Sequence, residues 1–219
     1  DGDFIHIIGR SGSGKSTFLN IVAGLLSADK GSLSLDGTNY MELPDEEKSE
    51  FRNKNIGFIP QSPALLSYLN VLENIRLPYD MYEKDGDSEG KARYFLNELG
   101  LEHLAKSYPK ELSGGEQQRV GIVRAIIATP KILLMDEPFS ALDAISRKQL
   151  QDLTKQLHQE FKMTTLFVTH DTDEAVKLAD RIAVLKDGEI VQVDTPYEIQ
   201  KNPANAFVKE LFKGGEHHE

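Results

Sequence analysis

The chain of 219 residues carries 25 Lys and Arg against 35 Asp and Glu, a formal net charge of −10, and 39% of its residues are hydrophobic. A chain of this length buries roughly 70% of its unfolded surface, so it forms one large domain or two small ones. It contains no Cys, which excludes disulfides, thiolate metal sites and cysteine nucleophiles and fits a reducing compartment. The acidic balance disfavours binding of nucleic acid through the overall field of the protein.

The first residues predict a strand that follows a turn. Asp1 and Gly2 are typical of a hairpin turn, and residues 4–8 (FIHII) have the apolar run of a strand. No strand precedes this turn in the numbered chain, so we expect that the numbering begins inside a domain whose first strands are absent. No apolar stretch approaches the roughly 20 residues that a membrane-spanning helix needs.

Strands and helices alternate along the rest of the chain, which predicts an α/β fold with crossover connections. Helical spacing is present over 18–26, in two stretches between 70 and 104 separated by Pro78 and the polar residues 83–90, and at 116–128, 145–160 and 173–179. Strands are predicted around 32–35, at 56–59, 131–136 and 164–169, and as a hairpin over 181–193.

A glycine-rich turn joins the first strand to the first helix. Residues 9–16 (GRSGSGKS) match the pattern G-x-x-x-x-G-K-[ST] in the strand-to-helix context that it requires. Glycines let successive backbone N–H groups approach an anion, Lys15 adds a positive charge toward the outer phosphates, and the Ser16 hydroxyl is placed for magnesium. The loop therefore predicts a nucleoside-triphosphate site, and leaves kinases, GTPases, motors and transport ATPases open.

Two adjacent acids follow the buried strand at 131–136. Carboxylates that leave the carboxyl edge of a central parallel strand face the crevice where a ligand lies. Asp136 is placed to hold magnesium and Glu137 to polarise an attacking water. Such a pair favours hydrolysis over kinase chemistry.

The segment LSGGEQQR at 112–119 is not explained by phosphate-loop chemistry. It resembles the signature sequence of ATP-binding cassette (ABC) ATPases, and the other motifs of that family occur in order. They are residues 9–16, 59–61 (IPQ), 133–137 (LLMDE), 140–143 (SALD) and 168–171 (VTHD). A P-loop kinase gives no reason for LSGGE.

The resemblance implies a P-loop NTPase fold: a mainly parallel sheet flanked by helices, with a small antiparallel β subdomain. It implies a single ABC domain over 1–213, a helical subdomain at about 62–130 inserted in a RecA-like core, and a flexible tail at 214–219. The family's adenine-stacking loop would precede Asp1, so we name no adenine-stacking residue.

The resemblance also implies roles for individual residues. Glu137, His170 and Gln61 are expected to act in catalysis, and Ser16, Gln61 and Asp136 to hold Mg²⁺. Ser113, Gly114, Gly115 and Asp143 are expected to reach the nucleotide of a second copy, although a helix cap also explains Ser113 and Asp143. The nucleotide itself is expected on Gly9, Arg10, Ser11, Gly12, Ser13, Gly14, Lys15, Ser16 and Thr17.

The family resemblance implies ATP hydrolysis coupled to transmembrane transport, as the ATPase subunit of an ABC transporter. It implies ATP and Mg²⁺ as ligands, and a homodimer or a heterodimer with another ABC subunit when ATP binds. It also implies integral membrane permease subunits as partners and a place on the cytoplasmic face of the membrane. The alternative is a soluble ABC ATPase that acts on nucleic acid or a protein, which the acidic composition and single-cassette length disfavour.

The direction of transport has two conflicting signals. DEPFSALD and the segment 194–208 look like importers of small polar solutes such as amines, anions or amino acids. The segment 42–61 looks like the subfamily of lipoprotein release, macrolide export and peptide-antibiotic resistance. We favour import.

Overall fold

The computed structural model describes residues 2–83 and 85–213, and the tail predicted at 214–219 lies outside these ranges. Its main sheet has the strand order β4-β5-β6-β1-β7-β8, with all neighbouring pairs parallel except β7 and β8. The strands are β1 Phe4–Ile8, β4 Ile56–Ile59, β5 Ile132–Asp136, β6 Thr164–Val168, β7 Arg181–Lys186 and β8 Glu189–Asp194. A separate hairpin pairs β2 Ser34–Leu35 with β3 Thr38–Asn39.

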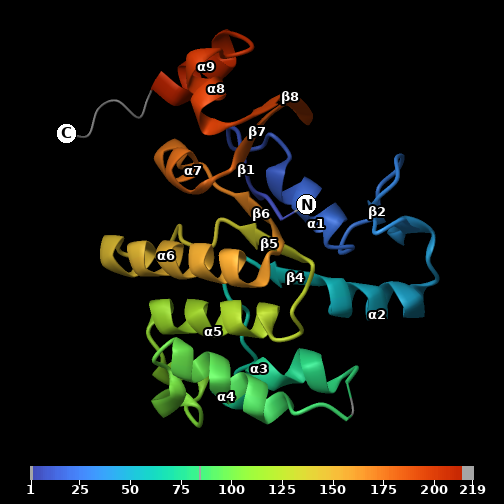
Figure 1. Cartoon of the computed structure of the whole chain (residues 1–219), viewed down its shortest axis with the longest axis vertical. Helices are drawn as coiled ribbons and strands as arrows, with labels where there is room; N and C mark the ends of the chain where they lie inside the picture. Colours follow the sequence, from blue (N-terminus) through green and yellow to red (C-terminus); the bar gives the residue numbers. More distant parts are fainter. Residues whose placement is uncertain (1, 84, 214–219) are drawn as a thin grey trace.

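Among the described residues, three α-helices lie between β4 and β5 along the chain and pack together: α3, α4 and α5. Figure 1 shows them beside α6, at the opposite end of the long axis from α8 and α9. That this segment is a separate helical subdomain stays a prediction. The helices are α1 Lys15–Val22, α2 Asp45–Asn55, α3 Val71–Asp80, α4 Ser88–Glu98, α5 Gly114–Ile126, α6 Ala144–Phe161, α7 Thr172–Leu178, α8 Pro196–Lys201 and α9 Ala206–Lys213.

The interior strand β5, next to the edge strand β4, is buried on both faces. Leu133 and Met135 belong to one apolar cluster, which includes residues of α3 to α6, whereas Leu134 packs in another cluster with Leu19 of α1. This alternation follows from the two-residue period of a strand. The continuous apolar run predicted for 131–136 is therefore confirmed as a strand with helices on both sides.

The first helix is shorter than its apolar spacing predicts. It ends at Val22, and Leu25 and Leu26, expected on its buried face, are 54% and 48% exposed. Gly24 turns the chain with φ of +68°, and a Cβ there would meet the Tyr40 hydroxyl at 1.8 Å. The buried Tyr40 ring thus requires glycine at this turn, which stops the helix.

Pro78 does not interrupt the helix at 70–80, contrary to the sequence prediction. It lies inside α3, which continues to Asp80. Proline removes one helical hydrogen bond, yet Val71, Ile75 and Tyr79 on the same helix are buried in the core. The burial of this apolar face offsets the missing bond.

His6, in the middle of β1, is fully buried among aromatic rings. Its ring stacks on Phe4 and Phe167 with centroids 5.1 and 4.6 Å apart. Neither ring nitrogen has a hydrogen-bond partner among the described residues. Burial lowers the pKa of His6 to about 3, so the folded protein holds it neutral.

We expect His6 to make stability depend on pH. Between its ordinary pKa of 6.5 and about 3, the unfolded chain binds a proton that the folded chain does not. The free energy of unfolding therefore falls as pH drops below 6.5, by about 1.4 kcal/mol per pH unit for this one group. His6→Phe should remove that part of the slope in urea unfolding between pH 7 and 5. His103→Phe, at an exposed position, should retain it; equal slopes in both variants would contradict the prediction.

Candidate functional site

The glycine-rich turn at 9–17 connects the end of β1 to the first turn of α1. Gly12 and Gly14 have φ of +79° and +96°, in the left-handed region that glycine adopts without strain. Gly14 is the N-cap of α1, and the first turn of that helix carries no acidic side chain. Unpaired N–H groups at a helix start and the positive end of its dipole favour an anion at this turn.

Lys15 and Ser16 open this helix. The Lys15 side chain is buried, and its Nζ donates hydrogen bonds to the backbone oxygens of Gly9 at 2.9 Å and Arg10 at 3.0 Å. Ser16 Oγ donates to Asp136 Oδ1 at 3.0 Å. The start of α1 and the end of β5 therefore meet at one hydroxyl and one carboxylate.

Two adjacent oxygen donors of this kind fit Mg²⁺, which takes few protein oxygens and keeps waters or phosphate oxygens as its other ligands. The part of the chain that the structure describes has no group of three or more His, Cys, Asp or Glu suited to a metal. A cation at Ser16 and Asp136 would accordingly need oxygens from a bound phosphate or from water.

The acidic pair at the end of β5 has an unusual backbone. Glu137 has φ of +44°, and its N–H donates to Val168 O at 2.9 Å. Ser140 Oγ donates to Glu137 O, which holds the turn from its other side. Burial raises the pKa of Asp136, and the hydroxyl of Ser16 that donates to it acts in the opposite direction.

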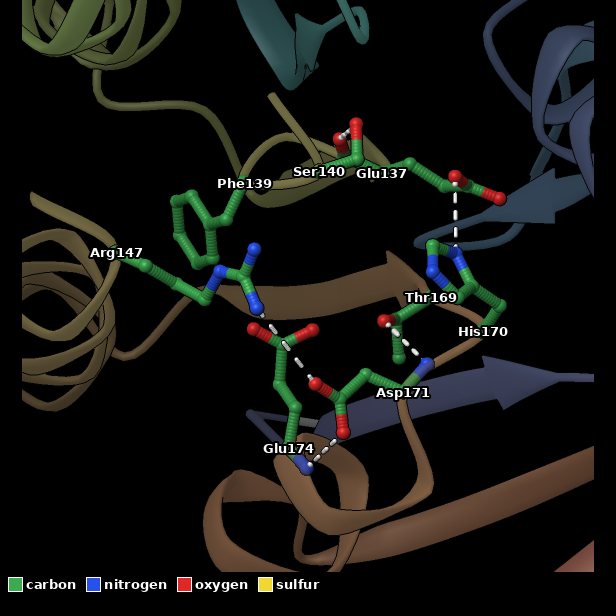
Figure 2. A pocket seen from close by; sticks show the side chains of 8 residues that line it. All are labelled: Glu137, Phe139, Ser140, Arg147, Thr169, His170, Asp171 and Glu174. Carbon is green, nitrogen blue, oxygen red and sulfur yellow. Dashed lines mark hydrogen bonds and ion pairs between the residues drawn. The ribbon is translucent and has the colours of Figure 1, made fainter. Parts of the chain in front are cut away.

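His170 stands at the end of the neighbouring strand, two residues after β6. Its Nδ1 lies 3.2 Å from Glu137 Oε2, as Figure 2 shows. The imidazole is more exposed than the carboxylate, with 67% of its side chain accessible against 26% for Glu137. Both groups are thus close together and reachable by solvent.

The structure brings eight of the predicted residues into one pocket of about 460 Å³. It is lined by Ser11, Gly12, Gly14, Lys15, Ser16, Thr17, Glu137 and His170. Arg10 and Ser13 line a neighbouring pocket with Phe207. Gly9 lies against β7, where a Cβ would meet Leu185 O at 2.3 Å.

Gln61 is near the pocket but not on the Ser16–Asp136 pair. Its Nε2 donates to Ser140 Oγ at 3.2 Å, and Ser140 Oγ donates in turn to Glu137 O. The amide is therefore connected to the Glu137 turn through one hydroxyl. Among the described residues, no hydrogen bond joins Gln61 to Ser16 or Asp136. Its role in holding magnesium stays a prediction.

The signature residues lie at the start of α5, outside this pocket. Ser113 is the N-cap of α5 and forms a capping box with Glu116, and Asp143 caps α6 through the N–H groups of Ile145 and Ser146. A Cβ on Gly115 would lie 3.4 Å from Ser146 Oγ, so the two helix starts are adjacent. Both capping interpretations made from the sequence are confirmed.

Two arginines that connect these segments were not predicted from the sequence. Arg124 of α5 donates to the backbone oxygens of Pro63 and Ala64, just after Gln61. Arg147 of α6 donates to Leu142 O, just before Asp143. No local pattern in a single sequence could have found them, because the acceptors are backbone oxygens, which no residue type marks.

A comparison with protein families decides which family these features belong to. The family profile described as "ABC transporter" matches residues 1–140. The chain belongs to the ABC transporter family.

Curated relatives of the ABC transporter family match nearly the whole chain. The glycine betaine/proline betaine transport system ATP-binding protein ProV of Escherichia coli (strain K12) is 42% identical over 215 residues, 98% of this chain and 54% of ProV. The trimethylamine N-oxide transport system ATP-binding protein TmoW of Pelagibacter ubique (strain HTCC1062) is 44% identical over 211 residues, 96% of this chain and 62% of TmoW. The chain thus spans between about half and two thirds of the length of these relatives.

Solved ABC structures have the same fold. The ATP-binding cassette MJ0796, in a dimeric post-hydrolysis state bound to ADP and phosphate, matches with a TM-score of 0.81 and 37% identity, covering 89% of this chain and 86% of MJ0796. The predicted fold class, a mainly parallel sheet flanked by helices with a small antiparallel sheet, is confirmed. No helix in residues 2–83 and 85–213 is long and apolar enough to cross a membrane.

Proposed function

We propose that the chain binds MgATP and hydrolyses it as the ATPase subunit of an ABC transporter. The observation that carries this proposal is the convergence of the glycine loop, Lys15, Glu137 and His170 on one pocket. Together these groups supply N–H donors and a cation for phosphates next to a carboxylate for proton transfer. The family and its ATP-binding relatives support the same activity.

The phosphate groups are bound by the loop at 9–17. Its N–H groups and the start of α1 surround the phosphates, and Lys15 adds a charge beside them. Ser16 and Asp136 hold Mg²⁺, which when bound neutralises the charge that develops on the phosphate oxygens. Because the chain has a net charge of −10, the attraction for ATP comes from these local donors.

Hydrolysis uses the pair at the ends of β5 and β6. The Glu137 carboxylate accepts a proton from water while the water oxygen attacks the γ-phosphorus. The bond from that phosphorus to the β–γ bridging oxygen breaks, and ADP and phosphate leave. His170, 3.2 Å from Glu137, orients the water. Gln61 is connected to the Glu137 turn through the Ser140 hydroxyl.

The signature residues act on a second copy. Ser113 and Gly115 lie at the start of α5, yet they do not line the pocket that Lys15 lines. A head-to-tail dimer, homomeric or with another ABC subunit, would place this helix start and Asp143 against the nucleotide of the partner. That the similar cassette MJ0796 was solved as a dimer bound to ADP and phosphate supports the dimer itself.

The membrane partner docks on an apolar groove of about 420 Å³ between α1, α2, β4 and α3. Leu25, Leu77 and Met81 line it and are 54%, 37% and 60% exposed. Arg124 also lines it and holds the two carbonyls that follow Gln61 by two and three residues. A permease helix bound here would therefore be linked to the Gln61 turn, with the ATPase on the cytoplasmic face of the membrane.

Import of a small polar solute is the direction that the relatives favour. They include proteins named for the transport of betaines, trimethylamine N-oxide and choline, and for the import of sulfate and thiosulfate. These names support the importer features of the C-terminal segment over the efflux features of residues 42–61.

Glu137→Gln should keep ATP binding and lower kcat by about 100-fold or more, because the amide has the same shape and cannot accept the proton. Phosphate release and binding of a fluorescent ATP analogue measure the two effects. Lys15→Ala should instead weaken binding itself, by about tenfold or more. Normal turnover in Glu137→Gln would contradict the proton-acceptor role.

Mixing two inactive variants tests the head-to-tail dimer. Ser113→Arg and Lys15→Ala should each be inactive alone, since each homodimer carries two defective composite sites. Their mixture should recover hydrolysis, because one site then combines an intact Lys15 loop with an intact Ser113. A mixture as inactive as its components would rule out this arrangement.

Met81→Asp should weaken binding to the membrane partner and leave ATP binding unchanged, because the charge is placed in the apolar groove. Co-purification with an integral membrane protein from solubilised membranes measures the effect. Tyr94→Asp is the control, since Tyr94 is also exposed (53%) but lies on α4 outside the groove. Equal loss in both variants would contradict the docking site.

A further inference from the structure

The pocket wall that Glu137 and His170 share also includes Arg147, Asp171 and Glu174. The proposed reaction assigns these three residues no role. Figure 2 shows them on α6 and at the start of α7, around a small pocket of about 40 Å³ that also touches Glu137 and His170. Their position beside the reacting groups raises the question of what they hold in place.

Arg147 contacts two functional turns at once. Its Nη2 donates to Leu142 O at 3.2 Å, and its Nη1 lies 4.0 Å from Asp171 Oδ2. Leu142 directly precedes Asp143, and Asp171 directly follows His170. One guanidinium therefore spans from the Asp143 turn to the side chain of the residue that follows His170.

Asp171 is itself fixed to the backbone of its turn. Its Oδ1 accepts the N–H of Glu174 at 3.0 Å, and its own N–H donates to Thr169 Oγ1 at 3.0 Å. On the far side, the buried Glu174 accepts a hydrogen bond from Gln151 Nε2 of α6 at 2.6 Å. Because these hydrogen bonds fix Asp171 to its own turn, a displacement of Arg147 would move the whole turn that carries His170.

Stability does not account for this arrangement. The Arg147 and Asp171 side chains are 37% and 38% exposed, and an ion pair at such a position contributes about 1 kcal/mol or less. Arg147 Nε is buried and has no hydrogen-bond partner among the described residues, which costs free energy. The guanidinium is therefore held in a geometry that packing alone does not favour, and that geometry joins the two turns.

We propose that Arg147 is a positioning residue that connects the Leu142–Asp143 turn to Asp171 and so sets the place of His170 relative to Glu137. The inference rests on the proposed function, in which Asp143 meets a second copy. Contact of the partner with Asp143 would then be transmitted through Arg147 to the hydrolytic pair. The residue should affect the rate of hydrolysis and not the binding of ATP on the Lys15 loop.

The test compares Arg147→Ala with Lys148→Ala, the exposed neighbour on the same helix. Arg147→Ala should lower kcat by about tenfold or more, as misplacement of a reacting group does. In the Glu137→Gln background it should leave the affinity for ATP and the formation of the dimer unchanged. Lys148→Ala should change neither kcat nor affinity. A kcat for Arg147→Ala equal to that of the wild type would overturn the proposal.

Two further variants separate positioning from folding. Arg147→Lys should recover part of kcat, because the ammonium keeps its charge toward Asp171 but lacks the second donor of the fork. Asp171→Asn combined with Arg147→Ala should lower kcat no further than the stronger single variant, since both break the same link. Fully additive losses would overturn the proposal.

A readout that needs no turnover distinguishes this inference from the proposed function. The imidazole NMR signal of His170 should shift in Arg147→Ala and stay in place in Lys148→Ala. If the wild-type chain hydrolyses no ATP, the proposed function fails while this measurement still decides the link. An unmoved His170 signal in Arg147→Ala would overturn the inference.

Discussion

The site depends on three parallel strands that end at the same edge of the sheet. Val168 of β6 is paired with Ile7 of β1 on one side and with Asp136 of β5 on the other. Ile7, Val168 and Asp136 thus lie side by side across the sheet. The glycine loop, the acidic pair and His170 all begin at this row or within two residues after it. Backbone hydrogen bonds of the ladder, and not contacts among the functional side chains, determine that the phosphate turn faces the two carboxylates. The carboxyl edge of a parallel sheet is the general place for ligands for this reason.

The backbone of Glu137, where the chain leaves β5, is strained. Its φ of +44° is rare for a residue with a side chain, and such a conformation costs about 1–3 kcal/mol. The turn persists because the Glu137 N–H donates to Val168 O and the Ser140 hydroxyl donates to Glu137 O. That hydroxyl also accepts from Gln61. The strained residue is thus the one at which β6, the Ser140 turn and the Gln61 segment meet, so a shift in any of them reaches the carboxylate.

The sequence predicts the site better than the connections between its parts. The bounds of β1 and β4 and the strand–loop–helix context of Lys15 follow from local apolar runs and glycines. The end of α1 does not, because Gly24 turns under a Tyr40 ring that comes sixteen residues later. The helix α2 has no buried residue, so it lacks the apolar period that reveals a helix. Arg147 and Arg124 were missed for a different reason: their acceptors are backbone carbonyls, which no residue type marks.

The two helix starts that carry the glycine motifs do not meet within one described chain, and the start of α5 is already capped by the Glu116 carboxylate. The start of α1 lines the pocket with Glu137 and His170, whereas the start of α5 lies beside the cap of α6. Within one copy, Ser113 Oγ is engaged with Glu116, both as donor and as acceptor. Its hydroxyl is free to meet a phosphate only when that capping box is rearranged or shared. In the proposed dimer, the same contact that completes the site would therefore pull on α5 and α6 together. Arg124 of α5 donates to a carbonyl near Gln61, and Arg147 of α6 donates to the carbonyl before Asp143. A displacement of either helix would therefore reach the Glu137 turn.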